Sequence, residues 1–199
     1  MSKKVGTGFW WLWLTANTCG SFFLPILIWQ DPYEIRSRIF LNAILQGTGM
    51  AIMQSSLLRS HISKRHWWFP LTMIGWIAGL SIISLFPSLG LHEAIFTEHF
   101  LTTLLLDFLI VGFIVGTLQW QLLRKFSAGS AWLLVSPLAL SCSALGLYWG
   151  YKIPSSLLST TIATGLQGLI YSAITGLFAI KILRSPKSKP KTQQPKANS

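Results

Sequence analysis

Six long apolar stretches follow one another along the chain, with short polar segments between them. An α-helix rises about 1.5 Å per residue, so about 20 apolar residues cross the hydrocarbon core of a bilayer, which is about 30 Å thick. The pattern therefore predicts an all-α integral membrane bundle of six transmembrane helices. The expected helices cover residues 9–29, 39–58, 67–86, 100–123, 131–149 and 157–182.

The composition supports this class of protein and suggests how the chain is divided. Of the 199 residues, 51% are hydrophobic and only 11% are charged, which is too apolar for a soluble domain of this size. We expect a cytoplasmic N-terminus at 1–8 and the six-helix domain at 9–183. Residues 184–199 contain no apolar side chain able to anchor a core, so we expect a disordered basic cytoplasmic tail there.

The basic residues give a net charge of +11, and most of them fall on one side of the predicted six-helix zigzag. The other side holds only Arg36, Arg38 and Lys152. Cytoplasmic loops carry the excess of Lys and Arg in membrane proteins, so we expect both termini in the cytoplasm. The membrane would be the bacterial cytoplasmic (inner) membrane, or the thylakoid membrane in a cyanobacterium. The 13 basic residues on the first side are Lys3, Lys4, Arg59, Lys64, Arg65, Arg124, Lys125, Lys181, Arg184, Lys187, Lys189, Lys191 and Lys196.

These charges also indicate which partners to expect. Lysines in the loops and in the tail are attracted to anionic lipid headgroups, and other membrane proteins are the second expected class of partner. Nucleic acid is not expected, because the basic residues are spread over separate loops rather than collected on one folded face.

Tryptophan provides an independent test of the helix ends. The indole ring prefers the headgroup level, where its N–H remains hydrated. Only Trp76 lies in the middle of a predicted helix. We therefore expect the tryptophans near the predicted cytoplasmic ends to sit at the membrane interface. They are Trp10, Trp11, Trp13, Trp67, Trp68, Trp120 and Trp132.

The second and fourth helices end alike, which indicates an internal repeat. Gln54 precedes Arg59 by five residues, Gln119 precedes Arg124 by five residues, and each arginine follows Leu-Leu. With the helix that follows each of them, they form a duplicated two-helix hairpin.

A third hairpin is predicted across the chain ends. Tyr171 in the sixth helix stands where Gln119 stands in the fourth, and an ungapped alignment places Trp11 over Trp68. We therefore expect a pseudo-threefold ring of three helical hairpins, closed by contact between the first and last helices.

The repeat resembles a motif, Gly-x-x-x-Gly-x-x-Gln-Trp-x-x-Leu-Arg, of uncharacterised bacterial membrane proteins, many of them cyanobacterial. The copy in the second helix departs from it at Ala51 and Ser55, and the copy in the sixth helix lacks the glutamine. The resemblance implies a multi-pass membrane fold and names no activity. The best copy is Gly112, Gly116, Gln119, Trp120, Leu123 and Arg124.

Two interpretations of the motif remain open. Gln54 with Arg59, and Gln119 with Arg124, can read an anionic headgroup or substrate, because an arginine fork pairs with phosphate or carboxylate. Alternatively, each glutamine bonds a neighbouring helix while its arginine reaches the membrane surface. Small residues at three- and four-residue spacing, such as Gly75 and Gly79, favour close helix packing.

Asp107 is the only acidic residue inside a predicted span. A carboxylate that faces lipid is unfavourable by at least about 2.5 kcal/mol, so we expect Asp107 to face the interior. Its expected partners include Asn42, Gln46 and Gln167, which would form a substrate site, a proton site or a structural polar network.

The motifs that carry chemistry are weak or missing. No nucleophile with a base, phosphate-binding loop or metal-ligand set is recognisable, so we expect no enzyme, no cofactor and no metal site. His92-Glu93 and Glu98-His99 have the composition of a solvated loop more than of a metal centre. The leading hypothesis is a non-enzymatic protein that assembles or organises membrane components. The alternative is a small-solute binding or transport protein, similar in length and helix count to the substrate-binding subunits of vitamin transporters.

Overall fold

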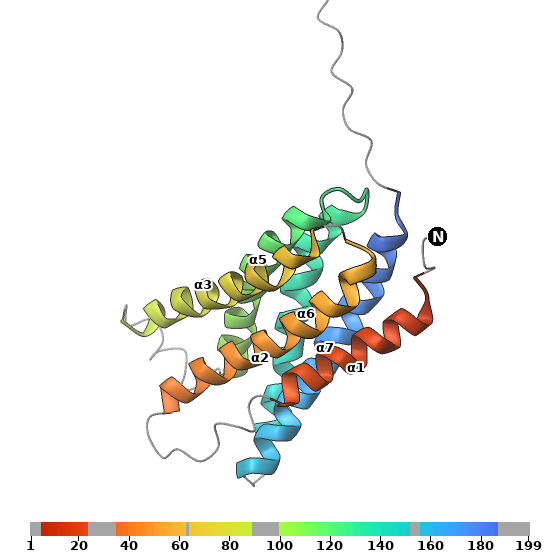
Figure 1. The fold of residues 1–199 in the computed structure, drawn as a ribbon. Coiled ribbons are helices and arrows are strands. Elements are labelled where there is room, and N and C mark those ends of the chain that lie inside the picture. Colours follow the sequence, from red (N-terminus) through yellow and green to blue (C-terminus); the bar gives the residue numbers. More distant parts are fainter. Residues whose placement is uncertain (1–4, 24–34, 63, 89–99, 152–155, 187–199) are drawn as a thin grey trace, which may run out of the picture.

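The computed structural model describes residues 5–23, 35–62, 64–88, 100–151 and 156–186. Within these ranges the chain is helical and has no strand, which confirms the predicted all-α class. Short 3-10 turns, η2 (Leu58–Ser60), η3 (Arg65–Trp67) and η4 (Gly129–Ala131), lie between the helices. The α-helices are α1 (Thr7–Phe23), α2 (Ile35–Leu57), α3 (Trp68–Ser88), α5 (Phe100–Leu123), α6 (Trp132–Tyr151) and α7 (Ser156–Arg184) (Figure 1).

These helices begin and end close to the predicted boundaries. Four of them, α3, α5, α6 and α7, are long and apolar enough to cross a membrane. The described part of α1 is 17 residues long, and the rest of the predicted first span lies outside the described residues. α2 has 23 residues but a more polar composition, because it carries Arg36, Gln46 and Gln54.

The helices form a closed ring in the order α1, α2, α3, α5, α6, α7. The ring closes because α7 packs against α1, and α1 begins where α7 ends (Figure 1). Trp10 Nε1 donates a hydrogen bond of 3.2 Å to the Ala173 carbonyl. At the chain ends, Arg184 Nε donates one of 2.6 Å to the Val5 carbonyl. The first and last helices therefore touch, as the repeat predicts.

A glycine lies in each of the six helix contacts of this ring. A Cβ atom added at any of these glycines would lie within 3.0 Å of an atom in the neighbouring helix. Close approach of backbones lets dispersion forces hold helices together in lipid, whereas at Gly47 and Gly176 the missing side chain makes room for a tryptophan ring. The six glycines are Gly20 (α1–α2), Gly47 (α2–α3), Gly75 (α3–α5), Gly112 (α5–α6), Gly146 (α6–α7) and Gly176 (α7–α1).

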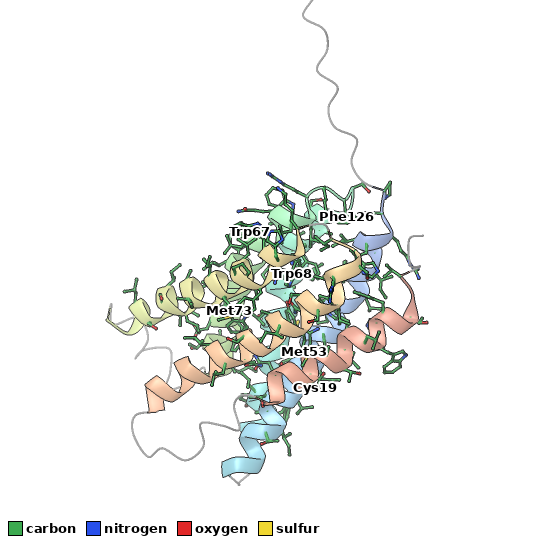
Figure 2. The ribbon with its side chains drawn as sticks, in the orientation of Figure 1. Cys19, Met53, Trp67, Trp68, Met73 and Phe126 are labelled. Carbon is green, nitrogen blue, oxygen red and sulfur yellow. The ribbon has the colours of Figure 1, made fainter. Side chains whose placement is uncertain are left out.

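The connection between α5 and α6 is hydrogen-bonded to the end of α7. Its turn is stabilised by a 2.9 Å hydrogen bond from the Phe126 N–H to the Leu123 carbonyl. The next residue, Ser127, donates its N–H to the Pro186 carbonyl at 3.0 Å. Figure 2 shows Phe126 in this loop, at the end of the bundle where α7 also finishes. This end of the bundle is therefore closed by backbone contacts as well as by side chains.

Candidate functional site

Three tryptophans, one from each of α1, α3 and α6, lie in the core of the bundle. Trp13, Trp68 and Trp132 are at most 1% exposed, and the rings of the latter two meet edge to face with centroids 6.1 Å apart. The prediction that they sit at the hydrated interface is wrong. Trp11 and Trp67 are the exposed ones, at 59% and 52%. Figure 2 shows Trp68 between the helices and Trp67 beside it at the surface.

Each of these three indoles donates its N–H to a side chain of a neighbouring helix, which explains how the ring can leave water. Trp68 Nε1 donates to Gln54 Oε1 at 2.9 Å. Trp132 Nε1 donates to Gln119 Oε1 at 2.9 Å. Trp13 Nε1 donates to Thr175 Oγ1 at 3.0 Å. One contact therefore occurs three times, twice with glutamine and once with threonine.

The third contact corrects the alignment predicted for the chain ends. Trp13, not Trp11, matches Trp68, and Thr175, not Tyr171, takes the place of Gln119. The sequence alignment matched a glycine and a pair of aromatic residues. In the structure, the equivalent positions are instead those that accept the indole hydrogen bond. Tyr171 lies one helical turn before Thr175, on the same face of α7.

The amide nitrogen of each glutamine donates a further hydrogen bond to a third helix. Gln54 Nε2 donates to Asn17 Oδ1 in α1 at 2.7 Å. Gln119 Nε2 donates to Thr72 Oγ1 in α3 at 2.8 Å. Asn17 and Thr72 each lie four residues after a buried tryptophan, and each donates to that tryptophan's carbonyl at 2.7 Å.

These bonds run through all six helices in one band, which we call the tryptophan–glutamine belt. Its three tryptophans pack into one apolar cluster with Leu58, Ile62 and Phe126, and a second apolar cluster contains Met50 and Val115. A belt of satisfied polar groups inside an apolar core fixes the register of the helices. Its members are Trp13, Asn17, Gln54, Trp68, Thr72, Gln119, Trp132 and Thr175.

The glutamine and the arginine of each predicted Gln–Arg pair lie in different environments. Gln54 and Gln119 are at most 1% exposed, whereas Arg59 and Arg124 are exposed. The amide oxygen and nitrogen of both glutamines are engaged inside the bundle, so a headgroup or substrate would have to break buried bonds to reach them. This is the arrangement that the packing interpretation of the motif predicts.

The predicted polar network is only partly assembled. Gln46 Nε2 donates to Gln167 Oε1 at 2.7 Å, which joins α2 to α7 across the interior. Gln167 Nε2 is buried and has no hydrogen-bond partner among the described residues. Asp107 is half-buried in α5 and bonds neither glutamine. Asn42 lies in α2, but its side chain is outside the part of the chain that the structure describes.

Other candidate residues can be placed briefly. The predicted His92-Glu93 and Glu98-His99 pairs lie outside the described residues. Within those residues, no group of three or more His, Cys, Asp or Glu side chains is arranged to hold a metal ion. Cys19 in α1 and Cys142 in α6 are free thiols, and Cys142 is exposed.

Sequence spacing carried a signal that the motif search missed. A polar residue follows each of Trp13, Trp68 and Trp132 by four positions, and position i+4 of a helix lies on the same face as position i. Asn17, Thr72 and Ser136 are the three residues at that spacing.

Four helices of membrane-spanning length around a hydrogen-bonded interior are the features of a helical membrane protein. The chain matches no protein-family model, no curated protein and no solved structure. The resemblance to bacterial proteins with a repeated Gln-Trp motif stays a prediction.

Substituting Trp13 with phenylalanine tests the contact that closes the ring. We expect the free energy of unfolding to fall by about 1–3 kcal/mol, because a buried hydrogen bond and part of the ring volume are lost. Trp11→Phe is the matched control on the same helix, and we expect a change within about 0.5 kcal/mol. Unfolding by SDS in mixed micelles measures both variants. Equal stability of the two variants would contradict the buried role of Trp13.

Proposed function

We propose that this chain is a six-span integral membrane protein with both termini in the cytoplasm, and that it assembles or organises other membrane components without catalysing a reaction. The position of the basic residues supports the orientation. Arg59, Lys64, Arg124 and Lys181 are exposed and belong to the end of the bundle where α1 begins and α7 finishes. That end would face the cytoplasm.

The observation that carries the proposal is the use of the motif residues inside the fold. Both elements of the repeat, the glutamine and the small residues, make contacts between helices rather than lining an open site. A core whose helices are held by these hydrogen bonds and close contacts is suited to present a fixed outer surface. The resemblance to multi-pass bacterial proteins is consistent with this role.

Two outer surfaces are then available to partners. The membrane-facing sides of the helices carry large exposed apolar side chains, including Phe113, Leu134 and Leu177 at 59–69%. Such side chains contact lipid acyl chains or the helices of another membrane protein. The basic residues at the proposed cytoplasmic end attract anionic headgroups, such as those of a bacterial cytoplasmic or thylakoid membrane.

Photo-crosslinking in native membranes tests the proposal directly. A photoreactive amino acid placed at Phe113, Leu134 or Leu177 surveys three different helices, and the buried Val135 serves as the matched control beside Leu134. We expect a protein adduct of one defined mass from at least one exposed position. Lipid adducts alone at all three positions, under several growth conditions, would overturn the proposed organising role.

A second candidate function, binding or transport of a small solute, is favoured by one observation. Gln167 buries an amide N–H without a partner in the described residues, next to its bond with Gln46. A buried unpaired donor is costly unless a ligand or water satisfies it. Asp107, which is half-buried in α5, would provide a carboxylate.

A thermal-shift screen with vitamins, amino acids and sugars tests this alternative. We expect a binding solute to raise the unfolding midpoint of the unaltered protein, and Asp107→Asn to abolish its uptake while the protein remains in the membrane. Leu106→Asn, at an exposed neighbouring position, is the matched control. Unchanged uptake by the Asp107 variant would remove this residue from the site.

A further inference from the structure

The tryptophan–glutamine belt is interrupted at one place, between α6 and α7. Ser136 follows Trp132 by four residues and so occupies the place of Asn17 and Thr72 in the other two hairpins. Those two residues accept hydrogen bonds from glutamine amides. The corresponding residue of α7 is Thr175, whose hydroxyl is occupied by Trp13 and by the Tyr171 carbonyl at 2.8 Å. α7 therefore supplies no amide that could reach Ser136 as Gln54 and Gln119 reach Asn17 and Thr72.

Ser136 is consequently a buried hydroxyl that lies near the Tyr171 hydroxyl but makes no direct hydrogen bond of normal geometry. Its side chain is 1% exposed, and its Oγ has no hydrogen-bond partner in the described part of the chain. An unpaired buried hydroxyl is destabilising, because it has lost its bonds to water and gained none in the protein.

A small cavity of about 10 Å³ lies beside this hydroxyl. On its polar side it is lined by Gln54, Thr72, Ser136 and Tyr171, and the Tyr171 hydroxyl faces both Gln54 and Ser136. Its remaining lining is apolar, from Met50, Trp76, Val115 and Leu140. A cavity of about 10–15 Å³ with two to four polar partners holds one water molecule.

We propose that this cavity binds one water molecule, which bonds Ser136 Oγ and the Tyr171 hydroxyl and so closes the belt between α6 and α7. The lining selects for water. It contains hydroxyl and amide groups but no ionised side chain, and a hard cation such as Ca²⁺ requires about six to eight oxygen ligands. A water molecule both donates and accepts, as two facing hydroxyls require.

Ser136→Ala gives opposite results with and without the water. If the water is bound, the variant removes one of its partners, and we expect the midpoint of thermal unfolding to fall by about 2–4 °C. If no water is bound, the variant removes an unpaired hydroxyl, and the midpoint stays or rises. Ser143→Ala is the matched control, because this buried serine on the same helix bonds only the nearby Leu140 carbonyl, at 2.6 Å. A fall no larger than that of the control overturns the proposal.

A structural experiment tests the same water independently of stability. An experimental map that shows ordered internal waters should contain a peak between Ser136 and Tyr171. The double variant Tyr171→Val with Thr175→Gln gives α7 the pair that α5 has in Val115 and Gln119, and the new amide should bond Ser136 and remove the peak. A map of the unaltered protein with ordered waters elsewhere but none in this cavity also overturns the proposal.

Discussion

Leucine in place of Gly49 is expected to prevent α1 from packing on α2 and to lower the free energy of unfolding by at least about 3 kcal/mol. A Cβ atom at Gly49 would collide with the Gly20 carbonyl oxygen, and one at Gly20 would lie 2.8 Å from the Gly49 carbonyl oxygen. Both obstacles are backbone, which cannot rotate aside. The yield of monodisperse protein in mild detergent and SDS unfolding measure the effect.

Gly8→Leu is the control for this substitution. Gly8 also lies in α1, but a Cβ atom there would have no neighbour within 4 Å, so we expect a change within about 0.5 kcal/mol. If both leucine variants were equally stable, the close approach of α1 and α2 would not be needed for the fold.

Leucine in place of Gln119 should destabilise the protein by about 1–3 kcal/mol, because it leaves the buried Trp132 N–H without an acceptor. Thr72 also loses its donor, although its hydroxyl keeps the 2.7 Å bond to the Trp68 carbonyl. SDS unfolding again provides the measurement. Gln121→Leu is the matched control, since Gln121 is exposed on the same helix and should tolerate the change.

A second variant separates the hydrogen bond from the packing. Combining Gln119→Leu with Trp132→Phe removes both partners, so no indole N–H is left unpaired, and we expect the pair to be less destabilised than the sum of the two single variants. Strict additivity would show that the bond between these residues contributes nothing to the belt.

The helices were predictable from the sequence because membrane spans need long apolar stretches. The end of α5 at Leu123 was predicted to the residue, and the contact of α1 with α7 followed from the repeat. The helix ends depend on composition, and the contact between α1 and α7 depends on the order of the repeated segments. Both can be read from one sequence.

The interior was less predictable, because tryptophan has two ways to satisfy its N–H. Trp11 and Trp67 are exposed, as indoles at the headgroups would be, whereas Trp13 and Trp68 find acceptors inside the bundle. Neighbouring tryptophans therefore have opposite positions, and the buried one of each pair is the one whose N–H meets an acceptor on the neighbouring helix. Asp107 was expected to bond Gln46 and Gln167, because a carboxylate inside a span needs polar partners. The two glutamines instead bond each other without it.

The contact between α7 and α1 means that the covalent order of the hairpins is not essential to the ring. A gene rearranged to begin at α2 and to finish with α1, with the present ends joined, would encode three uninterrupted hairpins: α2–α3, α5–α6 and α7–α1. The bond from Arg184 to Val5 shows that the joined ends already lie next to each other. We expect such a circular permutant to retain all six interhelical contacts.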